Sequence, residues 1–491
     1  MRAQQSEFDV RTRPVKSRVV LLVAASAMVI IGAILYQTRP EMISPLGALL
    51  ALATCVIGML PVLFYFLRDD RTIPFFPAVG LFQVFCFGLS PFLLHLAWAD
   101  APPIVYWGGR LTLSEESIKT LVLVLAGTAS LVGVFFLVRR HALGWLPVPR
   151  IRERAGGNAT LLLLCGLASA HLAYKLIPGV SRIPSAGQFL DPVGYVVFSA
   201  LLVLLLKRKT KGFYGVVAVF LLLMLAAARI ETFNFTQVML LLLCSIGALV
   251  YARAFRMASF CALLVVLSLP VYEFTATVRY LDGGFLTKAE ALLTTVDGYR
   301  KGVRRDGTRE DGTSATETAV RRISHTWLFA HVVAKSPSEV PFWGGETYKP
   351  LLTAMIPRAV WPGKPLEVTG GLFGKRYDLL EPTSVTSLNL PLHIETYVNF
   401  GSVGVVIGMA LIGAFLALMD KLLNAPGRRE LEMGIGLGIL MPLTFQDSNF
   451  SVMVGTLPQF VLCLYLYFLA GEFVLRRLGM GPAQAEGVAR D

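Results

Sequence analysis

The residues best suited to chemistry lie in one cationic stretch, residues 356 to 377, IPRAVWPGKPLEVTGGLFGKRY. Arg358 carries a planar guanidinium that matches pairs of phosphate oxygens, and Lys364 adds a compact positive charge. Trp361 lies between them and offers an apolar face for a sugar ring or for a lipid interface. Prolines and glycines prevent a long helix here, so we expect an irregular loop. Two interpretations stay open: an anion site, or cations that meet lipid headgroups.

A second set of basic residues lies in residues 314 to 337, SATETAVRRISHTWLFAHVVAKSP. Ser314 and Glu317 form a capping-box pattern that predicts a helix through this segment. At about 100° per residue, its polar face gathers Thr318, Arg321, Arg322 and His325. Adjacent arginines could hold a diphosphate. The alternative is an amphipathic helix on the membrane with its basic face in water.

The elements that position these residues are mostly membrane spans. The chain has 491 residues, 55% hydrophobic and 16% charged, with a mean hydropathy of +0.63. Windows of about 20 apolar residues, enough to cross roughly 30 Å of hydrocarbon, recur about twelve times. They cover residues 19–36, 45–67, 75–98, 118–138, 159–177, 190–206, 213–228, 235–251, 257–277, 397–419, 431–446 and 452–475. Two GxxxG pairs, at Gly404 and Gly408 and at Gly434 and Gly438, predict close helix packing.

The distribution of Lys and Arg between these windows predicts the orientation. Basic loops such as RRHALGWLPVPRIRER and KRKTK alternate with QTRPEMIS, RIETFN and QDSNFS, which carry almost no basic residues. We therefore expect an all-α polytopic membrane protein with both termini in the cytoplasm. We expect an N-terminal membrane region of about nine spans over residues 1–277 and a large outer loop with short amphipathic helices over residues 278–396. A C-terminal membrane region of about three spans over residues 397–476 and a cytoplasmic tail over residues 477–491 complete the chain.

Several kinds of site are missing from the sequence. All six cysteines fall in the apolar windows, so the outer loop has no disulfide and no thiolate nucleophile. The histidines lack the spacing of a zinc site, and there is no glycine-rich phosphate loop. The net charge of +13 reflects the positive-inside bias of membrane insertion. We expect no metal, no cofactor and no nucleic-acid partner.

Polar residues at the outer ends of two windows could line the floor of a cavity under the outer loop. Arg229 and Glu231 follow the seventh window, and Gln446, Asp447 and Asn449 follow the eleventh. Arg229 and Glu231 could equally cap a helix end or snorkel to the interface.

Two stretches carry a family resemblance. GGETYKPLLTAMIPRAVWPGKP, followed by NLPLHIETYVNFGSVGVVIGMALIGA, resembles the outer loop and next span of Wzy-type O-antigen polymerases, the bacterial oligosaccharide repeat-unit polymerases. That family often shows Pro-Arg-x-x-Trp-Pro-x-Lys-Pro, then an acidic residue shortly before Asn-Phe-Gly at the start of a transmembrane helix. The matching positions are Pro357, Arg358, Trp361, Pro362, Lys364, Pro365, Glu395, Asn399, Phe400 and Gly401. One departure is Ile394, where the family often has glycine.

The resemblance implies a membrane glycosyltransferase. Such an enzyme polymerises undecaprenyl-diphosphate-linked repeat units into O-antigen, capsule or exopolysaccharide on the periplasmic face of the bacterial cytoplasmic (inner) membrane. The donor carries its own activation, so no nucleotide or cofactor is needed. The implied partners are the lipid-linked oligosaccharide, membrane lipids, a chain-length regulator and a flippase.

The resemblance also implies roles for single residues. Fixed cations would stabilise the departing diphosphate, and the candidates are Arg321, Arg322, Arg358 and Lys364. A base must accept the proton of the acceptor hydroxyl, and the candidates, in order of preference, are Glu395, His393 and His325. Further substrate contacts are expected from Trp361, Tyr348, Arg229 and Asn399.

Two other functions stay open. An O-antigen ligase would share the Arg and His chemistry and differ in the acceptor, which would be a lipid A core. A transporter or flippase of lipid-linked sugars would instead need charged residues at mid-span and pseudo-repeats.

Overall fold

The structure is a computed structural model of the whole chain. It describes residues 43–67, 72–97, 104–106, 109–111, 116–146, 157–183, 186–207, 210, 212–268, 285–300, 323–358, 360–365, 368–384 and 386–478, with single positions 26, 30, 33, 34, 37, 275, 278 and 281.

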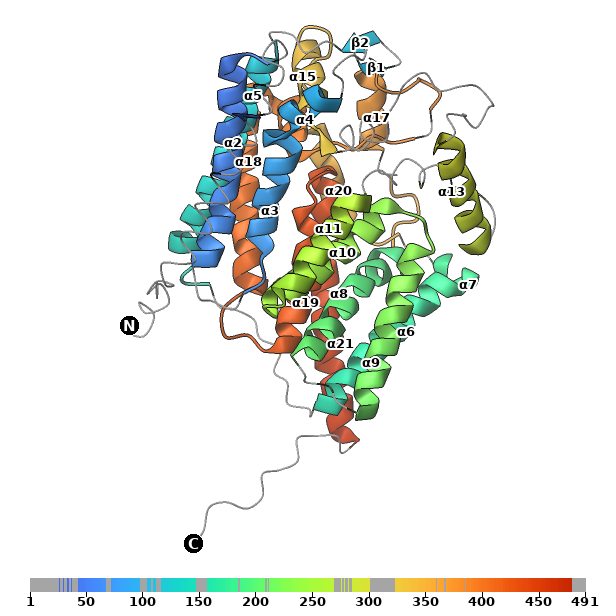
Figure 1. Cartoon of the computed structure of the whole chain (residues 1–491). Helices are drawn as coiled ribbons and strands as arrows, with labels where there is room; N and C mark the ends of the chain where they lie inside the picture. The colour runs from blue at the N-terminus through green and yellow to red at the C-terminus, as the bar shows by residue number, and fades with distance from the viewer. Residues whose placement is uncertain are drawn as a thin grey trace.

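The first part of the chain is built from helices and one small hairpin (Figure 1). In order, these elements are α2 (Pro45–Leu67), α3 (Phe75–Gln83), η2 (Val84–Gly88), α4 (Ser90–Ala97), β1 (Ile104–Tyr106), β2 (Gly109–Leu111), α5 (Glu116–Leu137), η3 (Val138–Ala142), α6 (Gly157–Leu176), α7 (Pro178–Ser181), α8 (Ala186–Leu206), α9 (Gly212–Ile230), α10 (Phe235–Tyr251) and α11 (Phe255–Ser268). Strands β1 and β2 pair antiparallel, with Val105 opposite Arg110.

Short helices follow, and then the long helices of the C-terminal part. They are α13 (Phe285–Arg300), α15 (Thr326–Lys335), η5 (Glu346–Tyr348), α16 (Lys349–Ala354), α17 (Thr369–Arg376), α18 (Leu392–Leu423), α19 (Glu430–Leu440), η6 (Met441–Thr444), α20 (Phe450–Val454) and α21 (Leu457–Arg477). Helices α15 and α17 lie near the hairpin at one end of the molecule (Figure 1).

The C-terminal helices pack between the N-terminal ones. Helix α18 packs most extensively against α5, and α19 against α8. A Cβ atom added to Gly434 or Gly438 would lie 2.5 or 2.4 Å from the backbone of α8, so the expected close packing is confirmed for this glycine pair. The other pair differs, because Gly404 and Gly408 face Thr396 of their own bent helix.

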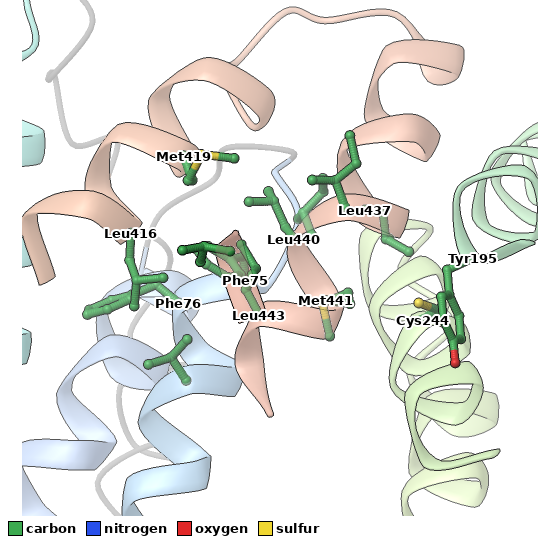
Figure 2. Packing of buried hydrophobic residues seen from close by; sticks show 14 of the residues in the cluster. Phe75, Phe76, Tyr195, Cys244, Leu416, Met419, Leu437, Leu440, Met441 and Leu443 are labelled. Carbon is green, nitrogen blue, oxygen red and sulfur yellow. The ribbon is translucent and has the colours of Figure 1, made fainter. Parts of the chain in front are cut away.

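The hydrophobic core joins these groups of helices. Leu437, Leu440, Met441 and Leu443 of α19 and η6 are buried. On one side they meet α3 and α18, through Phe75, Phe76, Leu416 and Met419 (Figure 2). On the other side lie Tyr195 of α8 and Cys244 of α10 (Figure 2). This core holds α3, α8, α10, α18 and α19 together.

The helical fold class is confirmed in its coarse form. Within the described residues, six helices are long and apolar enough to cross a membrane: Pro45–Leu67, Ile118–Ala142, Ala186–Leu206, Gly212–Ile230, Leu392–Leu423 and Phe450–Arg477. Shorter apolar helices lie in four further expected windows, at Phe75–Gly88, Thr160–Leu176, Phe235–Tyr251 and Phe255–Val265. Twelve crossings stay a prediction, and most of the window 19–36 falls outside the described residues.

Two expected boundaries are different in the structure. Of the helix expected over residues 314–337, residues 314–322 lie outside the described residues, Ser324 and His325 are not helical, and α15 begins at Thr326. The backbone N–H of His325 donates instead to the carbonyl of Cys86 at 3.0 Å. The span expected from residue 397 belongs to a helix that already begins at Leu392, directly after Pro391. His393 and Glu395 therefore lie in a helix and not in a loop.

Helix α18 is broken at Gly401, the glycine of the Asn-Phe-Gly motif. Its φ of 66° and ψ of −153° are not helical, and only glycine adopts this combination easily. A Cβ atom at this position would lie 2.8 Å from the ring of Phe342. The motif therefore marks a bend that separates a short first segment, with Glu395 and Asn399, from the long apolar segment.

Candidate functional site

A pocket of about 370 Å³ lies beside the segment that contains the cationic stretch. We call it the loop pocket. Residues from Trp343 to Leu372 form most of its wall, Gln188 of α8 adds to it, and Ser451, Val452 and Thr456 close it from the C-terminal part. Its volume is within the roughly 300–1,000 Å³ common for small-molecule sites.

The lining combines cations with many hydroxyl groups. The cations are Lys349, Arg358 and Lys364, and the five hydroxyl side chains are Thr347, Thr353, Thr369, Ser451 and Thr456. The buried indole N–H of Trp343 has no hydrogen-bond partner among the described residues. Hydroxyls and an indole donor suit a sugar, and the cations suit phosphate oxygens.

Arg358 and Lys364 hold the loop between them in shape. The guanidinium of Arg358 donates forward to the carbonyls of Lys364 at 2.6 Å and Pro365 at 2.9 Å. The ammonium of Lys364 donates backward to the carbonyls of Ala354 at 3.2 Å and Ile356 at 3.1 Å. Burial lowers the pKa of Lys364, and the neighbouring charge of Arg358 lowers it further. Both cations reach the pocket wall, but both also have a structural role.

Lys349, unlike Arg358 and Lys364, donates no hydrogen bond to a loop carbonyl among the described residues. It lines the pocket at the start of α16, its side chain is exposed, and its ammonium has no ion pair within the described part of the chain. The pocket carboxylate of Glu346 is paired with Arg376 at 3.2 Å. Arg376 in turn lies 4.3 Å from the ring centre of Trp343. The pocket therefore presents a net positive surface.

Glu395 lies one layer behind the pocket wall. It is 1% exposed, and its Oε1 accepts a hydrogen bond from the hydroxyl of Thr347 at 2.7 Å. Its Oε2 accepts from the backbone N–H of Phe450, the first residue of α20, at 2.6 Å. The hydroxyl of Ser451 donates to the carbonyl of Thr347 at 2.5 Å. Glu395 thus ties two pocket walls together, and Thr347 separates it from the cavity.

Asn399 and Tyr348 complete this support. The Nδ2 group of Asn399 donates to the Thr347 hydroxyl at 2.8 Å, and its Oδ1 accepts from the N–H of Gly345 at 2.9 Å. Tyr348 stacks on Phe400 with ring centres 6.3 Å apart. Burial, followed by the charge of Glu395, raises the pKa of Tyr348. Both residues position the wall and do not line the pocket.

His325 lies in a different buried cluster. Its Nε2 is 3.2 Å from Oδ1 of Asp447, and Oδ2 of Asp447 accepts a hydrogen bond from the amide of Asn389. The rings of Phe82 and Phe87 pack beside the imidazole, at 5.9 and 5.7 Å. Asp447, expected at a cavity floor, is thus the partner of His325. Neither residue lines the loop pocket.

His393 is enclosed between α5 and α18. It is 1% exposed, its ring centre is 4.5 Å from that of Phe87, and its Nε2 is 3.4 Å from the hydroxyl of Thr128. A Cβ atom on Gly127 would lie 2.7 Å from its ring. This histidine does not line the loop pocket.

Arg229 lies in a third buried cluster, at the end of α9. Its Nη1 donates to Asp191 and to Gln237, both at 3.1 Å, and its guanidinium carbon lies 4.2 Å from the ring centre of Tyr195. Lys175 also pairs with Asp191, at 2.6 Å. The cluster joins α6, α8, α9 and α10. Arg229 is therefore a buried link between helices and does not line the loop pocket.

Comparison with known proteins gives one match. A family model described as Domain of unknown function (DUF8712) matches residues 124–424, more than half of the chain. The chain belongs to this family. No curated protein and no solved structure matches it. The DUF8712 region contains Arg358, Lys364 and Glu395, while the pocket wall at Ser451 to Thr456 lies beyond it.

The structure thus brings together only part of the candidate set. Arg358 and Lys364 meet at the loop pocket, and Glu395 and Asn399 support its wall. Trp361 is 39% exposed and is outside the lining, and Arg321 and Arg322 lie outside the described residues.

The sequence did not single out three groups of the pocket: Thr347, Lys349 and Ser451. Thr347 and Lys349 lie within the stretch GGETYKP of the family resemblance, which was the available signal. The sequence around Ser451 gave no signal of a functional role, because a serine after a short polar loop is common in proteins. Over the described residues, no three His, Cys, Asp or Glu side chains converge as a metal site would require. A metal-free reaction stays a prediction.

Proposed function

We propose that the protein transfers a glycan from a polyprenyl-diphosphate carrier to the terminal sugar of another lipid-linked repeat unit, and so polymerises repeat units. The observation that carries the proposal is the loop pocket. It joins three cations to five hydroxyl side chains, and two of the cations, Arg358 and Lys364, belong to the polymerase-like motif.

In this reaction the acceptor hydroxyl oxygen bonds to the anomeric carbon of the donor. The bond from that carbon to the diphosphate oxygen breaks, and the lipid diphosphate leaves with the electron pair. Negative charge develops on the leaving oxygen, so fixed cations lower the barrier. Lys349 has the freest ammonium for this task, and Arg358 and Lys364 contribute charge from a preformed loop.

The acceptor proton must go to a base. We assign this role to Glu395 through the hydroxyl of Thr347, which lines the pocket and donates to the carboxylate at 2.7 Å. The hydroxyl passes its own proton to Glu395 and takes the proton of the acceptor. His393 is too enclosed for this role, and His325 faces Asp447 in another cluster.

The proposal includes the expected topology. The chain crosses the bacterial inner membrane about twelve times, with the loop pocket on the periplasmic side, where lipid-linked repeat units are polymerised. A flippase would supply the substrate, and a chain-length regulator would act on the product. An O-antigen ligase would use the same pocket with a lipid A core as acceptor.

The test uses purified full-length protein and lipid-linked repeat units, without nucleotide-sugar or added metal. We expect a ladder of products. Replacing Lys349 by Ala should reduce the rate roughly a hundredfold, which corresponds to about 3 kcal/mol of lost transition-state stabilisation. Lys375→Ala is the matched control, because Lys375 is exposed on α17 and does not line the pocket.

Arg358→Lys adds a second comparison. It keeps the charge but loses the fork that holds two carbonyls, so thermal melting must be measured with the rate. A ladder that forms only with a nucleotide-sugar would disprove the donor assignment. A product that forms only with a lipid A core acceptor would replace the polymerase by the ligase.

A further inference from the structure

A second pocket, of about 500 Å³, lies between the ends of α2, η3 and α18 and the start of α3. We call it the distal pocket. Glu395, behind the loop pocket, lies near the start of α18, whereas Asp420 and Asn424 of the distal pocket lie at its end. From Ser402, after the bend at Gly401, to Leu423, α18 is roughly 33 Å long at about 1.5 Å per residue. The two pockets are therefore separated by about the thickness of a bilayer.

Aromatic rings form the main wall of the distal pocket. Phe64 and Phe136 meet edge to face at 5.1 Å, and Phe76 stacks on Phe135. Phe64 lines the pocket, is 43% exposed, and belongs to α2, a helix apolar enough to cross a membrane. A partly exposed aromatic wall on such a helix suits the acyl chain of a lipid.

Among the described residues, the polar groups that line the distal pocket carry more positive than negative charge. Arg139 is neutralised by Asp420 at 2.8 Å. Asp420 is held in turn by Asn424, whose amide donates to it at 2.8 Å. Arg140 also lines the pocket, is exposed, and has no ion pair with any described residue. The pocket lining thus combines an apolar wall with one guanidinium that has no ion pair in the described part of the chain.

We propose that the distal pocket binds an anionic phospholipid, with its phosphate on Arg140 and an acyl chain against Phe64 and Phe136. The guanidinium matches phosphate oxygens, and basic pockets between spans suit anionic headgroups. The aromatic wall requires an amphiphile and not a free anion. In the expected orientation this lipid belongs to the cytoplasmic leaflet. The site is independent of the glycan reaction proposed above.

The experiment titrates delipidated full-length protein with phosphatidylglycerol and follows bound lipid by native mass spectrometry. Removing one cation near a lipid surface should weaken binding about fivefold, so we expect that loss for Arg140→Ala and near-normal binding for Arg140→Lys. Arg477→Ala is the matched control, because Arg477 is an exposed cation that does not line the distal pocket. Phe64→Ser should also weaken binding, because it removes part of the wall. Size-exclusion profiles confirm that each variant is folded.

Three results would overturn the proposal. One is equal affinity for phosphatidylglycerol and phosphatidylcholine, which would indicate unspecific surrounding lipid. Another is displacement of the lipid by excess inorganic phosphate, which would reduce the site to an anion contact. The third is unchanged binding in Arg140→Ala.

Discussion

At the residue scale, the carboxylate of Glu395 has a structural role in addition to its proposed role as the base. One oxygen accepts from a hydroxyl at 2.7 Å and the other from a backbone N–H at 2.6 Å, both out of contact with water. A buried hydrogen-bonding group that loses its partner lowers the stability of the protein by about 1–3 kcal/mol. Glutamine places an NH₂ group opposite one of these donors.

Glu395→Gln should therefore lower the free energy of unfolding by about 2 kcal/mol. Glu346→Gln is the control, because its half-exposed pair with Arg376 is worth about 0–1 kcal/mol. Thermal unfolding in detergent measures both. Equal stability of the two variants would show that the Glu395 contacts do not hold the pocket walls together.

The residues of the loop pocket show how far sequence reasoning reaches. Arg358 and Lys364 were identified by type and motif, because cations in a broken loop are unusual in an apolar chain. Their bonds to loop carbonyls were not predictable, since these depend on backbone angles that proline and glycine only restrict. Lys349 was missed because a single lysine has no spacing pattern.

At the element scale, the bend at Gly401 decides where Glu395 and Asn399 point. Gly401→Ala should destabilise the protein by about 1–3 kcal/mol, because alanine disfavours this backbone conformation and its Cβ atom would meet Phe342 at 2.8 Å. The same change at Gly133 of α5, which has open space around it, should cause no loss, since alanine favours helix. Thermal unfolding of the two variants checks this pair, and equal melting temperatures would contradict a strained bend.

The elements also show a limit of pattern reasoning. Apolar windows predicted most long helices closely, since composition alone defines a span. The interruption before α15 was not predicted, because the helix pattern continues through Ser324 and His325. Tertiary contacts with Cys86 and Asp447 outweigh that local preference.

At the scale of the whole molecule, the expected orientation places the loop pocket and the distal pocket on opposite sides of the membrane. Cysteines introduced by Glu381→Cys and Trp145→Cys, in a background with Cys463→Ser, test it because both positions are exposed. A maleimide that cannot cross membranes should label the first variant in spheroplasts with an intact inner membrane, and the second only after lysis. Labelling of both before lysis, or the reverse order, would refute the topology and with it the periplasmic reaction.

The arrangement of helices was beyond the sequence. The glycine pair at Gly434 and Gly438 predicted a close helix contact, but nothing in the pattern indicated that the partner would be α8. Such pairings join segments far apart in the chain, and a single sequence carries no signal for them.

The packing of α18 on α5 has a consequence for biosynthesis. Helix α5 ends at Leu137, and α18 begins at Leu392. At about 5–20 residues per second, the ribosome needs on the order of ten to fifty seconds to make the chain between them. During that interval the polar side chain of Thr128, on the face of α5 that will meet His393, has no partner from α18. The face of α5 that meets α18 is therefore without its final helix partner until α18 has been translated.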